Sequence, residues 1–152
     1  MLFRSSATKW LQKIELTTWD HVGYWIDKGW SKLGPVKLQS RIDLPRPGAT
    51  LATGRQRVAG VAWAPHTGVA KVEVRFDGGE WQPTQLMPNV VAAGGNATDA
   101  WVQWTAEWNA IPGEHSIEVR ATDLTGAVQT ADVAPVAPDG ATGHHHVSFD
   151  VA

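Results

Sequence analysis

The sequence has 152 residues, a formal net charge of −2, and 43% hydrophobic against 18% charged residues. This composition is typical of a globular protein with a core and excludes a disordered chain. There is no cysteine, which excludes disulfides, zinc–thiolate sites and cysteine nucleophiles, and no apolar run approaches the roughly 20 residues that span a membrane.

The N-terminal part of the chain differs from the rest, and we divide the two near Gln39. Residues 1–40 carry six Lys/Arg and three Asp/Glu, a balance of +3, whereas residues 41–152 carry seven and twelve, a balance of −5. The mildly acidic body has no basic stripe, which argues against a nucleic acid partner. Residues 1–35 hold several tryptophans and one short strand candidate, Lys13–Thr17, but cannot close a core. We expect this segment to pack on another surface.

Residues 36–152 predict seven or eight short strands separated by turns. Val69–Asp77 alternates most clearly, with Val72, Val74 and Phe76 on one face. We place Val61 and Trp63 on the same inner face. The expected strands are Val36–Leu44, Arg57–Ala64, Val69–Asp77, Trp81–Met87, Ala100–Ala110, His115–Asp123, Val128–Val133 and His144–Val151.

Two further features support an all-β fold. Asp77-Gly78-Gly79 predicts a hairpin turn, and Ile117, Val119 and Ala121 are expected to point inward from their strand. No segment shows helical periodicity. The pattern predicts an immunoglobulin-like antiparallel β-sandwich with an irregular N-terminal extension.

His66, in the turn sequence APHTG, is a candidate catalytic base. It has neither a nucleophile nor an orienting acid beside it in the sequence, so we interpret it as a solvated turn residue. The carboxylates Asp77, Glu80, Glu114 and Glu118 show no pair marked as acid and base.

The histidine run at 144–146 offers a metal site as an alternative. On a strand, His144 and His146 share one face while His145 joins Val147, Phe149 and Val151 on the other. Two histidines could chelate a metal only with a third ligand from elsewhere. We favour a polar strand entry.

The sequence WVQWTAEW places Trp104 and Trp108 on one face of a strand, where core packing is expected, and Trp101 on the opposite face. An exposed Trp101 could anchor an interface or serve as a sugar platform. A carbohydrate-binding β-sandwich that uses exposed tryptophans is therefore the alternative function. Asn96-Ala97-Thr98 matches the glycosylation triplet, a match that is frequent by chance.

An ordered set of segments resembles the C-terminal part of sulfite oxidase-type molybdopterin-dependent oxidoreductases. The likeness covers nearly all of residues 8–151, and it is the order of the segments that is specific. They are KWLQKIEL, GPVKLQSRIDLPRPGATLATGRQRVAGVAWAP, VAKVEVRFDGGEWQPTQL, WVQWTAEWNAIPGEHSIEVRATDLTGAVQ and APDGATGHHHVSFDV.

In that family an N-terminal domain holds the molybdenum cofactor through a cysteine thiolate, and an immunoglobulin-like domain, often called the dimerisation domain, follows it. The resemblance implies that residues 1–35 are the tail of a missing cofactor domain plus a linker, and that residues 36–152 are the dimerisation domain. It implies a homodimer, with molybdenum–molybdopterin in the full-length parent and none bound by this chain alone. The chain would be a fragment of an oxidoreductase that does not catalyse by itself.

The resemblance also implies site residues, although no catalytic or metal-binding residue is expected in this chain. Ala7, Thr8 and Lys9 match the family position whose backbone and lysine approach the pterin phosphate. His146 falls where sulfite oxidases carry an arginine that lines the anion pocket; a histidine is not permanently charged, which puts sulfite in doubt as the substrate. The resemblance favours a bacterial cell-envelope location, with a periplasmic or membrane-associated parent, over the cytoplasm.

Overall fold

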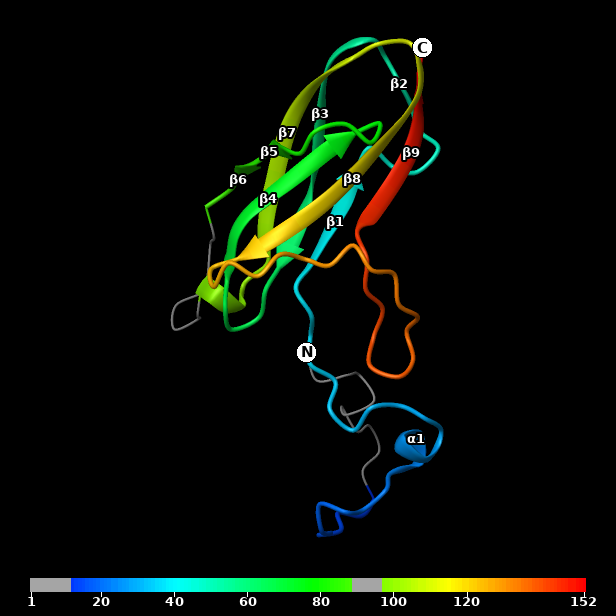
Figure 1. Cartoon of the computed structure of the whole chain (residues 1–152), viewed down its shortest axis with the longest axis vertical. Helices are drawn as coiled ribbons and strands as arrows, with labels where there is room; N and C mark the ends of the chain where they lie inside the picture. Colours follow the sequence, from blue (N-terminus) through cyan, green and yellow to red (C-terminus); the bar gives the residue numbers. More distant parts are fainter. Residues whose placement is uncertain (1–11, 89–96) are drawn as a thin grey trace.

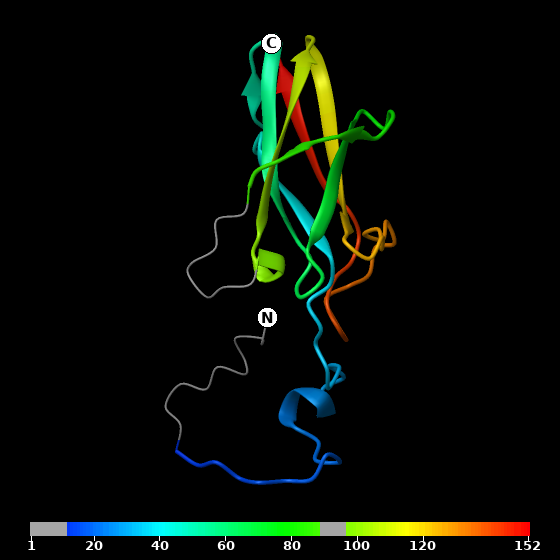
Figure 2. The ribbon, with the colours of Figure 1, turned by 90° about the vertical axis from the view of Figure 1, so that its left-hand side faces the viewer.

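Two β-sheets packed face to face form the body of the molecule (Figures 1 and 2). The structure is a computed structural model that describes residues 12–88 and 97–152. The four-stranded sheet has the order β1-β3-β7-β6 and the five-stranded sheet the order β2-β9-β8-β4-β5. The strands are β1 (Gln39–Leu44), β2 (Thr50–Leu51), β3 (Gly54–Trp63), β4 (Val69–Phe76), β5 (Gln82–Pro83), β6 (Gln85–Leu86), β7 (Val102–Ala110), β8 (Gly113–Asp123) and β9 (His145–Val151).

The predicted all-β, immunoglobulin-like sandwich is confirmed. Neighbouring strands pair in antiparallel fashion, except that β2 runs parallel to β9. The helices in the described residues are one turn each, α1 (Tyr24–Asp27) and the 3-10 turn η2 (Ala97–Asp99).

The core lies between the sheets, where alternate side chains of each strand meet. Trp104 is 1% exposed, and the inward positions predicted on β4 and β8 are all buried. The buried core residues are Ile42, Val58, Ala62, Val72, Val74, Phe76, Trp104, Ala110, Ile117, Val119, Ala121, Val147, Phe149 and Val151.

The predicted inner face of β3 is wrong. Val58, Gly60 and Ala62 are buried, whereas Val61 and Trp63 face outward and are half-buried. The Trp104 indole fills the space beneath Gly60, because a Cβ on that glycine would lie 2.7 Å from Trp104 Cζ2 and 1.9 Å from the carbonyl oxygen of Arg41. Packing against a large neighbour therefore selects the smaller residues for the core side.

The single strand predicted at Trp81–Met87 is also wrong, since it is two short strands in different sheets. β5 pairs with β4, and β6 pairs with β7. The chain crosses between the sheets at Thr84, whose N–H and hydroxyl both donate to the carbonyl of Val72. Pro83 has no N–H to continue a ladder, so the strand cannot run on. The predicted hairpin is confirmed, with Asp77 at φ 51°.

Two predicted strands are not strands in the structure. Lys13–Thr17 is exposed and has no partner strand. Within Val128–Val133, Val128 makes only an isolated bridge to Thr122. A strand needs a neighbour for its backbone hydrogen bonds, and this stretch instead belongs to a long loop, residues 124–144.

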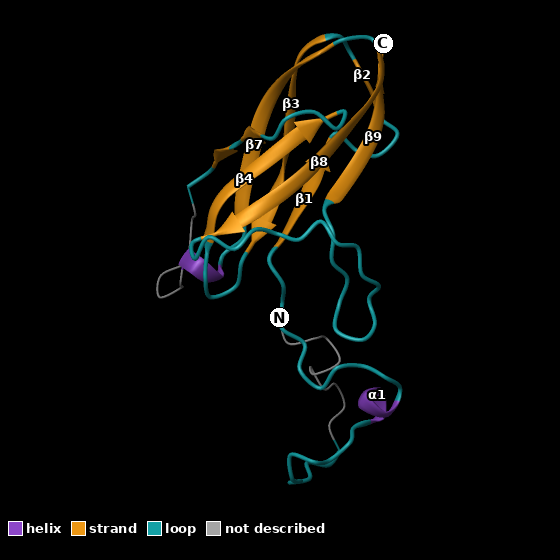
Figure 3. Ribbon diagram, viewed as in Figure 1, coloured by secondary structure: helices purple, strands orange, loops and turns teal. Residues whose placement is uncertain are grey.

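The N-terminal segment (residues 12–38) leaves the sandwich at the end from which the long loop hangs (Figure 3). The two are joined by hydrogen bonds. Ser31 N–H donates to the carbonyl of Pro138 at 2.8 Å, and Lys37 Nζ donates to the carbonyl of Gly140 at 2.8 Å. This end of the molecule therefore brings together segments from both ends of the sequence.

Candidate functional site

His146 lies on β9 and is exposed on the outer face of the five-stranded sheet, opposite Glu118 of β8 in the strand register. Its predicted orientation away from the core is confirmed. The neighbouring His145 points to the inner side, at the open edge of the sandwich, where its Nδ1 accepts a hydrogen bond from the N–H of Ile42 at 3.1 Å.

His144 precedes β9, and both of its ring nitrogens face oxygen acceptors. Nδ1 lies 2.7 Å from Glu118 Oε1, and Nε2 lies 3.1 Å from the carbonyl oxygen of Gln129. No ring nitrogen of His144 is left for a metal shared with His146. The described residues also contain no group of three or more His, Cys, Asp or Glu that could hold a metal ion.

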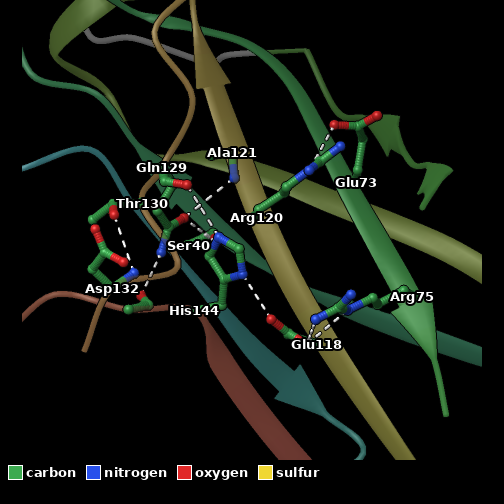
Figure 4. Close-up of polar contacts among 11 residues, drawn as sticks. Ser40, Glu73, Arg75, Glu118, Arg120, Ala121, Gln129, Thr130, Asp132 and His144 are labelled. Carbon is green, nitrogen blue, oxygen red and sulfur yellow. Dashed lines mark hydrogen bonds and ion pairs between the residues drawn. The ribbon is translucent and has the colours of Figure 1, made fainter. Parts of the chain in front are cut away.

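Charged side chains surround His144 on the outer face of the five-stranded sheet (Figure 4). Arg75 Nε donates to Glu118 at 2.7 Å, and Arg120 Nε donates to Glu73 at 3.0 Å. Burial alone would raise the pKa of Glu118, but hydrogen bonds from His144 and Arg75 lower it overall. The pKa of Glu73 is lowered in the same way by Arg120 and Lys71, against the effect of burial.

Trp81 covers this charged network. The guanidinium carbons of Arg75 and Arg120 lie 4.7 and 4.2 Å from its ring centroid, and His144 meets it edge-on at 5.5 Å. Cations stacked on an indole are favourable contacts. The network is thus internally paired and capped, which suits a rigid surface better than a binding pocket.

Gln129 is a buried hub that links three parts of the fold (Figure 4). Its Oε1 accepts from the Ser40 hydroxyl at 2.6 Å and from the Ala121 N–H at 3.2 Å, and its Nε2 donates to the Gly143 carbonyl at 3.0 Å. It therefore ties β1 to β8 and to the loop before β9. Sequence reasoning missed Gln129, because a glutamine in a turn-rich stretch is usually exposed and nothing local marks it as buried.

Two other histidines pair with carboxylates. His66 is an exposed turn residue, as predicted, with 86% of its side chain exposed and its Nδ1 2.8 Å from Asp99 Oδ1. His115 Nδ1 lies 2.8 Å from Asp77 Oδ2 and its Nε2 lies 2.8 Å from the Ile111 carbonyl oxygen. The hydrogen bond with Asp77 raises the pKa of His115. Neither pair includes a hydroxyl nucleophile, so the geometry of the described residues provides no catalytic triad.

Trp101 is exposed on the outer side of the four-stranded sheet, as predicted, at 49%. Its ring is tilted by 37° against Trp63, with centroids 5.6 Å apart, and the Arg41 guanidinium lies 5.6 Å from its centroid. Trp63 Nε1 donates to the carbonyl of Asp99. The two indoles do not form a flat platform of the kind that stacks on a sugar ring.

Several known proteins are similar to this chain in sequence or in structure. Sulfite oxidase of Gallus gallus is 27% identical over an alignment of 150 residues, which covers 86% of this chain and 32% of that protein. The crystal structure of the sulfane dehydrogenase SoxCD from Paracoccus pantotrophus matches with a TM-score of 0.53 and 24% identity, covering 62% of this chain and 23% of that one. A fibronectin(III)-like module of CbhA from Clostridium thermocellum gives a TM-score of 0.42 at 18% identity, over 74% of this chain and 95% of the module. No protein-family model matches the sequence.

The chain is similar in sequence to part of a sulfite oxidase. It spans about a third of the length of the sulfite oxidase that it matches, 32%. The SoxCD likeness supports the fold. The resemblance seen in the sequence is therefore confirmed at the level of one domain.

The described residues of this chain do not fit a molybdenum ligand set. The chain has no cysteine, and its described histidines and carboxylates are paired or dispersed. Ala7, Thr8 and Lys9 lie outside the described residues, so their contact with a pterin phosphate stays a prediction. Asn96 also lies outside them. No helix in the described ranges has the length and apolar character to cross a bilayer.

Proposed function

We propose that this chain is the C-terminal structural domain of a sulfite oxidase-like molybdenum-cofactor oxidoreductase. It packs against the cofactor domain and contributes subunit contacts, and it does not catalyse alone. The observation that carries this proposal is the sequence match, which takes in 86% of the chain but only 32% of sulfite oxidase. A domain that is part of a larger enzyme explains why no catalytic set is assembled in its described residues.

The N-terminal segment supports a partner domain. Among its described residues it exposes large apolar side chains that bury little against the sandwich: Ile14, Leu16, Trp19, Val22, Tyr24, Trp25 and Leu33. Exposed apolar patches of this kind mark interaction sites. The long loop adds exposed Val133 and Val136 at the same end of the molecule.

In the proposed parent, residues 1–35 lead from the cofactor domain and residues 36–152 form the dimerisation domain. Lys9 would donate to the pterin phosphate, and His146 would face the anion pocket. An exposed side chain on a rigid, ion-paired sheet face is suited to reach a neighbouring domain. No chemical step is assigned to this chain.

The product of the complete reading frame tests the proposal. We expect a cysteine-bearing cofactor domain upstream of residue 1 and molybdenum in the purified product by elemental analysis. Lys9→Ala should lower the molybdenum content while the matched Lys13→Ala does not. An upstream sequence without such a domain, or a product without molybdenum, would contradict the proposal.

The carbohydrate-binding alternative has less support. It depends on Trp101, whose neighbours Trp63 and Arg41 leave a tilted pair in place of a flat stacking surface. The geometry suits an anchor in a protein interface better.

A further inference from the structure

One hydrogen bond at the open edge of the sandwich depends on the protonation state of a histidine. β1 is an edge strand of the four-stranded sheet and lies against β8 and β9 of the other sheet. The N–H of Ile42 donates to Nδ1 of His145 at 3.1 Å. The seam between β1 and β9 is therefore closed at this point by an imidazole.

Only a neutral imidazole with its proton on Nε2 can make this contact. Protonation of Nδ1 would turn the acceptor into a donor and set two N–H groups against each other. Burial of His145 lowers its pKa, Arg41 and His146 act in the same direction, and Asp43 opposes them. The folded seam thus selects the neutral form.

The bond lies at the sandwich end of a longer seam. Toward the N-terminal segment, the Ser40 hydroxyl donates to Gln129. Further along, Lys37 Nζ donates to the Gly140 carbonyl and lies 3.6 Å from Asp139 Oδ1. A cavity of about 710 Å³ opens between these two sides of the seam. The N-terminal segment is held to the sandwich along this line.

The other charged groups and the second histidine around the cavity do not depend on the His145 imidazole. Lys37 and Asp139 face each other across the seam and make no contact with that imidazole. Both ring nitrogens of His144 face oxygen acceptors, so an added proton breaks neither bond. Of the two described histidines that line the cavity, His144 and His145, only His145 loses a hydrogen bond when its ring is protonated.

We propose that His145 is a pH-sensitive latch: when it is protonated, the β1–β9 seam opens and the N-terminal segment turns relative to the sandwich. The β1–β3 ladder and the inter-sheet core remain intact, because neither uses the imidazole. The displaced edge of β1 carries Ser40 with it, which loosens the hydrogen bond from Ser40 to Gln129 and, through Gln129, the loop whose Gly140 carbonyl binds Lys37. The latch would set the orientation of whatever precedes the N-terminal segment. The inference rests on the seam alone and does not require the proposed function.

The absence of native cysteine makes the test direct. Spin labels are attached to Asp20→Cys and Glu114→Cys, which are both exposed. The distance between them, measured by pulsed electron–electron double resonance, reports the position of the N-terminal segment relative to β8. We expect one narrow distance distribution at about pH 8 and a second, shifted population at about pH 5. Far-UV circular dichroism should show a folded sandwich at both values.

Three variants separate the latch from general acid effects. His145→Gln offers a non-titrating carbonyl oxygen to Ile42 and should keep the narrow distribution at both pH values. His145→Leu cannot accept and should show the shifted population at both. His146→Gln is the matched control and should respond as the wild type does. The proposal is overturned if the wild-type distribution does not change, or if His145→Gln changes as the wild type does.

Discussion

His115 and His145 lie toward opposite ends of the β8–β9 ladder, and their hydrogen bonds require opposite protonation states of the ring. Each ring nitrogen of His115 faces an acceptor, so only the imidazolium can donate both bonds. His145 must accept at Nδ1 and is bound as the neutral form. The same residue type is thus held in two charge states by its hydrogen-bond partners.

The direction in which stability changes with pH follows from the pKa shifts of these two histidines. The raised pKa of His115 means that its contribution to stability is complete below the ordinary value of 6.5 and is lost as the pH rises through the raised pKa. The lowered pKa of His145 means that its contribution is present above 6.5 and is lost as the pH falls through the lowered pKa. Stability contributed by these two histidines therefore declines on both sides of a window around 6.5.

Asp77→Asn tests the first of these assignments. The amide keeps an oxygen for the Ser116 N–H, which donates to Asp77 Oδ1, but removes the charge beside His115. We expect the pKa of His115 to fall in an NMR titration of its ring protons. The free energy of unfolding near pH 6 should fall by about 0.5–1 kcal/mol, a small value because Asp77 is half exposed.

The matched control is Asp99→Asn, which changes the carboxylate beside the exposed His66. This variant should leave the pKa of His115 unchanged. An unaltered His115 titration in Asp77→Asn would show that the Asp77 hydrogen bond is not what raises the value.

At the scale of elements, the backbones of β1 and β3 approach each other closely at Gly60. A Cβ there would lie 1.9 Å from the Arg41 carbonyl oxygen and 2.7 Å from the Trp104 indole. Backbone and a buried ring cannot both move aside cheaply. Glycine at this position is therefore required by packing and not by a turn.

Gly60→Ala should lower the free energy of unfolding by about 3 kcal/mol, because overpacking between the paired strands β1 and β3 forces their backbones apart. Urea denaturation followed by tryptophan fluorescence measures it. Gly23→Ala is the control, since a Cβ at Gly23 meets nothing within 4 Å, and its effect should stay within about 0.5 kcal/mol. Equal stability of the two variants would contradict the packing argument.

The strands β4, β8 and β3 show where the local sequence pattern predicts the inward face correctly and where tertiary packing overrides it. β4 and β8 keep their predicted inward faces because large apolar residues alternate with charged ones along both. β3 does not, since Val61 and Trp63 are larger than the residues that face the core at Gly60 and Ala62. Hydrophobicity ranks single residues, whereas Trp104 on β7, the neighbouring strand of the same sheet, determines how much volume is left for the inward side chains of β3.

On the scale of the whole molecule, the paired outer face of the five-stranded sheet contrasts with the exposed apolar N-terminal segment. The first is closed by ion pairs under Trp81, and the second has few contacts with the sandwich. Contact with the proposed cofactor domain is expected where this apolar surface is uncovered.

The proposed subunit contacts predict reversible self-association of the chain. Sedimentation equilibrium of residues 1–152 should give a weight-average mass that rises from about one to about two chains with concentration. The variant Trp25→Ser with Leu33→Ser removes apolar surface from the N-terminal segment only. A dimer that persists in this variant supports a subunit contact through the sandwich. A wild-type chain that stays monomeric, or a dimer that is lost in the variant, contradicts that contact.

The sequence by itself determined the fold class, the turn at Asp77–Gly79, the burial of Trp104 and the resemblance to sulfite oxidase-type enzymes. These depend on alternation, turn chemistry and the order of segments, all of which can be seen along the chain without knowing which residues meet in space. The pairings at the candidate site are not local. Gln129 joins Ser40 across 89 positions and His145 joins Ile42 across 103, so only the tertiary structure, which sets strand register and burial together, decided which of the chain's polar residues act as partners.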